Sequence, residues 1–194
     1  MIALITGAPG VGKTTTARNL AVMYGDRVET VSFGRLIYDR VTARTPMSYQ
    51  EFRSAAASIV TAADLLAASD ALAAHAAMPR HSGRWLVVES HAVAREEFGW
   101  QANPDPPGTL ARYSYDILVY LDAPADVILG RVRSDPGGRL SRGLRDITVL
   151  SAMQMAIAVS YAAGLGIPLN VIDADAPATA VTAAVASILG LACS

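Results

Sequence analysis

Residues 7–14 read Gly-Ala-Pro-Gly-Val-Gly-Lys-Thr, which matches the pattern G-x-x-x-x-G-K-[ST] at every specified position. An apolar run of strand length, residues 2–6, precedes this segment, and helical spacing of apolar residues begins at about residue 14. Glycines let a backbone wrap around an anion with its N–H groups facing inward, and a helix start adds its positive dipole end. The pattern therefore predicts a phosphate-binding loop between a strand and a helix, and residues 7–14 are called the phosphate loop below.

The phosphate loop also predicts the ligand. Lys13 is expected to reach the β- and γ-phosphates of a nucleotide, and the Thr14 hydroxyl is expected to bind Mg²⁺. The predicted cofactors are therefore ATP and Mg²⁺. The residues expected to surround them are Gly7, Gly10, Val11, Gly12, Lys13, Thr14 and Thr15.

Apolar runs alternate with helical patterns along the rest of the chain. Strands are predicted at residues 2–6, 28–33, 85–89, 117–121 and 169–172, and helices at 14–24, 35–44, 124–133, 146–163 and 177–191. A further helical region, continuous or broken, extends from a capping box at Ser48 and Glu51 to about residue 77. Residues 99–112, rich in proline and glycine, are predicted to form a loop.

Five strands separated by helices predict an α/β fold with a parallel sheet covered on both faces. Folds of this kind bind ligands beyond the carboxyl ends of their strands. The chemistry is therefore expected just after residues 6, 33, 89 and 121.

Composition limits the kinds of partner. The 194 residues carry a formal net charge of −1, so there is no overall field that attracts nucleic acid or acidic membranes. The single cysteine, Cys193, excludes a disulfide framework. The N-terminus does not resemble a signal peptide, and the alanine-rich residues 55–77 carry polar side chains that argue against a membrane span. We expect one cytoplasmic domain, residues 1–194, that binds a small molecule and neither a membrane nor nucleic acid.

Two acidic residues end predicted strands and compete as partners of the metal. Glu89 ends Leu-Val-Val-Glu, and Asp122 ends Leu-Val-Tyr-Leu-Asp. A carboxylate in this place can hold Mg²⁺ or orient an attacking hydroxyl. Asp122 precedes Pro124 and fits the N-cap of the following helix, so Glu89 is the preferred acid of the site.

Arginines gather in residues 131–146, around Pro-Gly-Gly at 136–138. Planar guanidinium groups suit bidentate contacts with phosphate, and a Gly-Gly pair suits a segment that must close. This segment is predicted to be a lid, with a solvent-exposed helix end as the alternative. The arginines considered for it are Arg131, Arg133, Arg139, Arg142 and Arg145.

Candidates for the acceptor side follow other strand ends. Arg35 could hold an acceptor phosphate or form an ion pair with Asp39 one helical turn later, and Arg53 lies on the capped helix. His91 is a candidate for acceptor binding or acid–base chemistry, with a structural role as the alternative. Of the aromatic residues that could stack on a base, Trp85 is expected in the core; the others are Trp100, Tyr113 and Tyr115.

These patterns together resemble the archaeal-type adenylate kinases and the small nuclear adenylate kinase-like ATPases. The similarity lies in the phosphate loop, in Ser-Phe-Gly at 32–34, Val-Val-Glu-Ser-His at 87–91, Ile-Leu-Gly-Arg at 128–131 and Ser-Tyr at 160–161. It implies a nucleoside-monophosphate kinase fold with strand order 2-3-1-4-5 and transfer of the ATP γ-phosphate. Gly34 and Arg53 would then lie at the acceptor site, in a helical segment at about 34–78, and Arg131, Arg139, Arg142 and Arg145 in the lid.

Two departures from the family bear on the acceptor. The family has Asp where Glu89 stands, and it has an Asn-Arg pair where this chain has Gln154 and Met155. Glutamate at position 89 places the carboxylate one methylene further from the backbone. The change at positions 154 and 155 removes an arginine that could bind a phosphate or a nucleotide. The leading acceptor is a nucleoside monophosphate. The alternatives are a hydroxyl of a nucleoside, sugar or specialised metabolite, and, in a different class of function, a regulatory or assembly NTPase.

Overall fold

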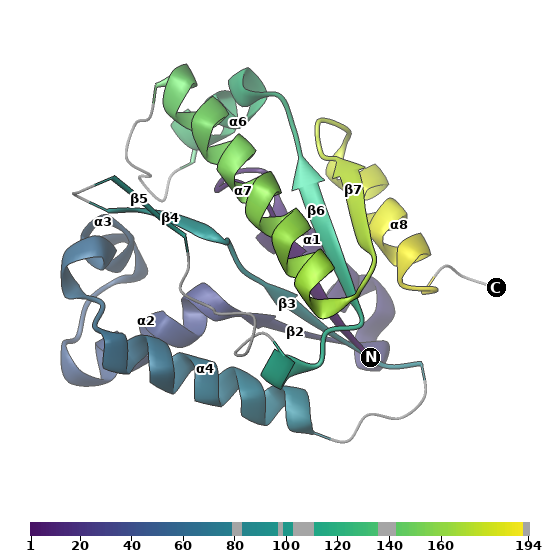
Figure 1. The fold of residues 1–194 in the computed structure, drawn as a ribbon, viewed down its shortest axis with the longest axis horizontal. Coiled ribbons are helices and arrows are strands. Elements are labelled where there is room, and N and C mark those ends of the chain that lie inside the picture. The colour runs from purple at the N-terminus through teal and green to yellow at the C-terminus, as the bar shows by residue number, and fades with distance from the viewer. Residues whose placement is uncertain (79–82, 97–98, 103–110, 136–142, 192–194) are drawn as a thin grey trace.

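A five-stranded parallel sheet forms the centre of the molecule (Figure 1). The computed structural model describes residues 1–78, 83–96, 99–102, 111–135 and 143–191. The strand order is β2-β3-β1-β6-β7, so the first strand lies in the middle and the predicted order 2-3-1-4-5 is confirmed for this sheet. The strands are β1 (Ile2–Thr6), β2 (Val28–Ser32), β3 (Trp85–Glu89), β6 (Ile117–Asp122) and β7 (Leu169–Asp173).

Helices cover both faces of the sheet, as predicted. Because side chains alternate along a strand, Ala3 and Ile5 of β1 join one hydrophobic cluster, whereas Leu4 joins the other. The first cluster receives side chains from α1 (Lys13–Tyr24), α6 (Ala125–Arg133) and α8 (Ala178–Ile188). The second receives them from α2 (Phe33–Arg44), α4 (Ala62–Ala77) and α7 (Leu144–Leu165).

The helical region after α2 is broken in two. The capping box at Ser48 and Glu51 starts α3 (Tyr49–Ile59), as predicted. A second capping box, at Thr61 and Asp64, starts α4, and the two helices meet at a bend of 119°. Thr61 and Asp64 satisfy backbone donors that would otherwise be unpaired at a new helix start, so the break has a defined chemical cause.

A two-stranded antiparallel hairpin follows β3, made of β4 (Val93–Glu96) and β5 (Gly99–Ala102). The prediction of a loop at 99–112 is therefore wrong for its first four residues, and a 3₁₀ turn, Ala111–Tyr113, occupies part of its end. The rest of that segment lies outside the described residues. Local composition did not indicate the hairpin, which is anchored at its start by a side chain of α7 described below.

The N-cap expected at Asp122 is also wrong. Strand β6 continues through Asp122, which pairs with Asp173 of β7, and its carbonyl accepts a hydrogen bond from the Ala174 N–H at 2.6 Å. The N-cap of α6 is Pro124, and it makes no side-chain capping hydrogen bond. Because α6 begins only at Ala125, Asp122 lies two residues before the N-cap position and cannot cap the helix.

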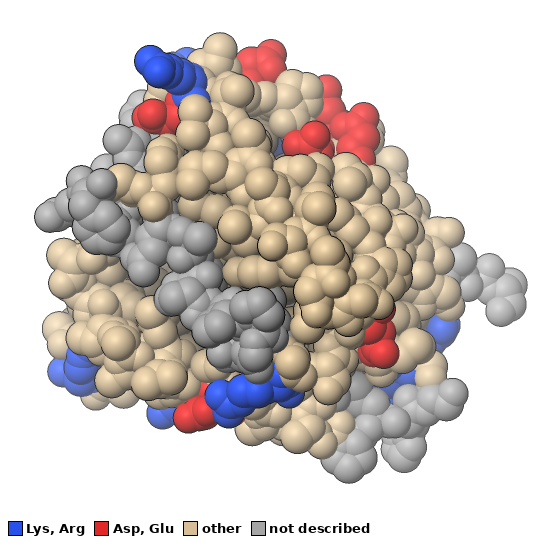
Figure 2. Space-filling model, viewed as in Figure 1, with Lys and Arg blue, Asp and Glu red and all other residues tan. Residues whose placement is uncertain are grey.

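Helix α7 is the longest described helix and has no charged residue after Asp146. By length and composition alone it could span a membrane, and the bent pair α3 and α4 would pass the same test as a second span. Its Leu150 and Ala158 are buried. Figure 1 shows α7 lying along the sheet, and Figure 2 shows mostly uncharged surface on this side of the molecule.

Asp64 provides a test of how the second capping box contributes to stability. The Thr61 N–H lowers the pKa of Asp64 below its ordinary value, and the Thr61 hydroxyl and Arg44 add to this, against the opposing effect of burial. A lowered folded-state pKa stabilises the fold above the unfolded value, about 3.9, and this contribution is lost as the pH falls through the folded value. Asp64→Asn should lower the free energy of unfolding by about 1 kcal/mol at pH 7.

Urea unfolding of both proteins between pH 7 and pH 3 measures this difference, which should shrink below about pH 4. Asp70→Asn is the matched control, because Asp70 lies on the same helix in an exposed ion pair with Arg112. A loss of stability at Asp70 as large as that at Asp64 would contradict the capping explanation.

Candidate active site

The phosphate loop joins β1 to α1 as predicted, and its glycines adopt conformations that favour glycine. Gly7, Gly10 and Gly12 have φ angles of 140°, 94° and 115°. A Cβ on Gly7 would collide with the carbonyl oxygen of Leu121 on the neighbouring strand. Glycine at position 7 therefore lets the loop start in close contact with β6.

Lys13 opens α1 and is the only lysine in the chain. Its Nζ donates hydrogen bonds to the carbonyl oxygens of Gly7 at 2.7 Å and Ala8 at 3.1 Å. The ammonium group is thus held across the loop, at the end of α1 that carries the positive dipole. Two sources of positive potential converge on one place, which is suited to an anion.

Thr14 joins the phosphate loop to β3. Its hydroxyl donates a hydrogen bond of 2.7 Å to Oε2 of Glu89, which is buried at the end of that strand. Glu89 lies beside the loop because β1 and β3 pair in parallel with Ile5 opposite Glu89. A hydroxyl and a carboxylate oxygen at this spacing are the hard ligands that Mg²⁺ prefers. No group of three or more His, Cys, Asp or Glu side chains suited to a metal occurs within the described residues.

A cleft of about 490 Å³ opens beside the phosphate loop. Residues 10–16 form one side of it, so all the expected nucleotide-binding residues except Gly7, which starts the loop, line the cleft. Arg131 and Asp135 come from the end of α6, and Ala174 and Ala176 from the turn after β7. The Arg131 guanidinium donates to the Val11 carbonyl at 3.3 Å, which holds it against the loop.

The structure brings one of the four expected lid arginines to the cleft. Arg131 lines it, whereas Arg145 is exposed in the first turn of α7. Arg139 and Arg142 lie outside the described residues, as does the Pro-Gly-Gly segment at 136–138. Arg133, also considered for the lid, is exposed at the end of α6.

The arginines expected at the acceptor site form ion pairs within the protein. Arg35 is exposed and pairs with Asp39 at 3.0 Å, the alternative raised by their spacing in the sequence. Arg53 on α3 pairs with Asp135 at 3.2 Å, with both side chains mostly buried. Since Asp135 lines the cleft beside the phosphate loop, this ion pair links α3 to that cleft. Gly34 lies in the first turn of α2, after β2.

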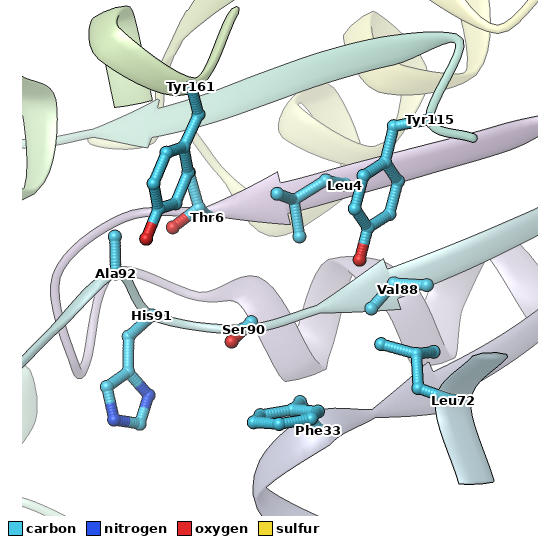
Figure 3. Close-up of a pocket in the computed structure, with 10 residues that line it drawn as sticks. All are labelled: Leu4, Thr6, Phe33, Leu72, Val88, Ser90, His91, Ala92, Tyr115 and Tyr161. Carbon is cyan, nitrogen blue, oxygen red and sulfur yellow. The ribbon is translucent and has the colours of Figure 1, made fainter. Parts of the chain in front are cut away.

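A second, smaller pocket lies over the carboxyl-terminal halves of β1 and β3, and His91 is at its edge (Figure 3). It has a volume of about 20 Å³. His91 is largely exposed, and Ser90 and Ala92 on either side of it also face the pocket. Its other residues are Val88 of β3 and residues from five further parts of the chain: Leu4, Thr6, Phe33, Leu72, Tyr115 and Tyr161.

The aromatic residues considered for stacking on a base differ in how far they are buried. Trp85 is buried in the core as expected. Tyr113 is also buried, with its hydroxyl hydrogen-bonded to Ser69, so the expectation that it could stack on a base is wrong. Tyr115 is buried and lines the smaller pocket, whereas Trp100 lies on the hairpin strand β5.

Gln154 is a residue that the sequence marked only as a departure from the resembling family. It is fully buried on α7; its Oε1 accepts from the Ala92 N–H at 2.7 Å, and its Nε2 donates to the Val93 carbonyl at 3.0 Å. The side chain therefore pairs with the backbone at the start of β4, as a neighbouring strand would, and fixes the segment after His91.

Tyr120 of β6 holds the same helix against the sheet. Its hydroxyl donates a hydrogen bond to the Ser151 carbonyl at 2.9 Å, and burial raises the pKa of that hydroxyl.

Comparison with known proteins agrees with this geometry. A family model described as an AAA domain matches residues 6–148, a stretch that contains the phosphate loop, Glu89 and Arg131. No curated protein matches the chain. Among solved structures, a gluconokinase from Sinorhizobium meliloti 1021 matches with a TM-score of 0.57 and 15% identity, over 97% of this chain and 90% of that chain. At this identity the likeness concerns the fold, and it confirms the predicted α/β class.

Replacing Gln154 tests its positioning role. Gln154→Met keeps a similar volume but leaves the Ala92 N–H and the Val93 carbonyl buried without their partner, and each such group costs about 1–3 kcal/mol. We expect the free energy of unfolding to fall by about 2–4 kcal/mol, measured by urea unfolding. Met155→Leu on the same helix is the control, with an expected loss below about 1.5 kcal/mol. Equal losses for the two variants would contradict a specific role for the amide.

Proposed function

Because this chain belongs to the AAA domain family and has the fold of P-loop kinases, we propose that it moves the γ-phosphate of ATP to a small molecule. The observation that carries the proposal is the contact between Thr14 and Glu89 at 2.7 Å. It joins the loop that suits a triphosphate to the end of β3, beside which an acceptor can bind. In this proposal Thr14 binds the metal, and Glu89 acts between the nucleotide and the acceptor.

Positive charge around the cleft supports the proposal. Phosphoryl transfer spreads negative charge over three equatorial oxygens of the transferred group, and catalysis depends on cations that stabilise it. Lys13 is held across the loop, and Arg131 lines the same cleft. We propose that both bind the phosphates, together with Arg139, Arg142 and Arg145 when the segment at about 131–146 closes. Closure would exclude water and so favour transfer over hydrolysis.

The metal proposal has the same basis. We propose that Thr14 and Glu89 hold Mg²⁺ together with phosphate oxygens, since this ion usually keeps few protein ligands and several waters. The ion would neutralise charge on the β- and γ-phosphates. Glu89 would also orient the acceptor, because the residues that follow it line the smaller pocket.

The acceptor side is proposed to comprise the helical segment at about 34–78, with Gly34, Arg35 and Arg53, together with His91. The resemblance to adenylate kinase-like enzymes favours a nucleoside monophosphate there. The pairing of Arg35 with Asp39 and of Arg53 with Asp135 weakens that choice, since a phosphate would have to displace a carboxylate at either arginine. A single domain in the cytoplasm remains part of the proposal.

Lys13 allows a direct test, because a lysine-selective reagent has a single lysine target in this chain. Mg-ATP should protect Lys13 from acylation, as measured by mass spectrometry of the peptide that contains it, with the N-terminal amine as internal reference. Lys13→Ala should lower turnover by at least about a hundredfold, because it removes a charge that stabilises the transition state. Arg18→Ala, on an exposed position of the same helix, should leave turnover unchanged.

The proposal fails if ATP gives no protection, or if a correctly folded Lys13→Ala protein retains its turnover. Brisk ATP hydrolysis that no small acceptor accelerates, but a macromolecule does, would support the regulatory NTPase instead.

Glu89 and Asp122 offer a matched pair of acids at strand ends. Glu89→Gln should lower turnover about a hundredfold or more while changing ATP affinity only a few fold, because the carboxylate acts on the metal and on the acceptor. Asp122→Asn should change turnover and ATP affinity little, since Asp122 is exposed and caps no helix. Steady-state kinetics and calorimetric titration of ATP measure the two effects. The opposite pattern would assign the catalytic acid to Asp122.

A further inference from the structure

The smaller pocket contains a buried hydroxyl without a partner. Thr6 is 2% exposed, and its Oγ1 makes no hydrogen bond in the structure. Thr6 lies immediately before Gly7, so this hydroxyl faces the pocket at the point where the strand gives way to the phosphate loop (Figure 3). Buried polar groups are almost always paired, so an unpaired one beside a reactive site needs a partner from elsewhere.

The remaining lining is largely apolar, and its described residues include no arginine, lysine, aspartate or glutamate. Phe33, Leu72 and Tyr115 supply apolar surface, and Ser90, His91 and Tyr161 supply polar groups. No arginine or lysine is among the described residues that line this pocket. The cleft beside the phosphate loop differs, since Lys13 and Arg131 both line it. A phosphate in the smaller pocket would meet no cationic guanidinium or ammonium donor among the described residues that line it.

We propose that the group which accepts the phosphate is a hydroxyl on an uncharged molecule with an apolar body, and that Thr6 binds this hydroxyl. The inference rests on the proposed function and specifies its acceptor class. A volume of about 20 Å³ admits one hydroxyl or one water, so the apolar body lies at the open side, beside Phe33.

The proposed reaction is a single displacement. The acceptor oxygen forms a bond to the γ-phosphorus of ATP, and the bond from that phosphorus to the β–γ bridging oxygen breaks. ADP leaves with the electron pair of the broken bond, and the hydroxyl proton passes to solvent water. Thr6 is a binding residue in this step, because its hydroxyl fixes the position of the attacking oxygen.

The first test compares two ligands that differ only in the acceptor group, benzyl alcohol and benzyl phosphate, with AMP as a third. Calorimetric titration with each of the three, in the presence of saturating Mg-ADP, measures the preference. Benzyl alcohol should bind at least tenfold more tightly than benzyl phosphate or AMP. Tighter binding of either phosphate would overturn the inference, as would equal binding of all three.

The second test uses a matched pair of buried threonines. Thr6→Val removes an unpaired hydroxyl at nearly constant volume, so the melting temperature should stay the same or rise, while the affinity for benzyl alcohol falls about fivefold or more. Thr182→Val removes a buried hydroxyl that donates to Ala178 at 2.7 Å and accepts from Asn19 at 3.3 Å, so it should lower the melting temperature and leave affinity unchanged.

A fall in melting temperature for Thr6→Val as large as that for Thr182→Val would mean that a buried water alone pairs with Thr6, and it would overturn the inference. The failure of this inference is distinguishable from that of the proposed function. Protection of Lys13 by Mg-ATP together with phosphorylation of a phosphate-bearing acceptor would reject the hydroxyl class alone. Absence of protection by Mg-ATP would reject both.

Discussion

The parallel pairing of β1 with both β3 and β6 determines where every other group of the site lies. Ile5 lies opposite Glu89 on one side, and Thr6 lies opposite Tyr120 on the other. In a parallel sheet all carboxyl ends meet at one edge, so this register delivers the phosphate loop, the acid at the end of β3 and the turn after β6 to the same place. A shift of one residue would turn Glu89 to the opposite face and break its contact with Thr14.

Alternation along β1 also separates two chemical environments. Ile5 faces the cluster under α1 and α8, whereas Leu4 and Thr6 face the side covered by α2, α4 and α7. The cationic cleft therefore forms around the helix start, and the smaller pocket forms on the α7 side. In the proposed reaction, the charged donor would bind on the cationic side and the uncharged acceptor on the other, with the reacting atoms between them.

Much of the fold and part of the candidate site could be predicted from the sequence, because the sequence patterns that indicate them are local. The phosphate loop, the strand set and the capping box at Ser48 depend on residues within one or two turns of one another. The hairpin after β3, the second pocket and the pairing of Arg53 with Asp135 depend on contacts between residues far apart in the chain. Asp122 was misassigned for the same reason, since its pairing with β7 overrides a local capping preference.

Gln154 connects the unpredicted hairpin with the smaller pocket. Its amide is fully buried and satisfies one donor and one acceptor of the chain segment that follows His91. A guanidinium cannot do this, because arginine has donors and no acceptor, and a buried charge there would need a carboxylate partner. An amide at position 154 thus fixes the segment after His91 without adding charge to it. In the resembling family's pattern Asn stands where Gln154 does and Arg where Met155 does, so the amide is kept at position 154. The arginine is lost at position 155, where Met155 packs against the hydrophobic cluster on this face of the sheet.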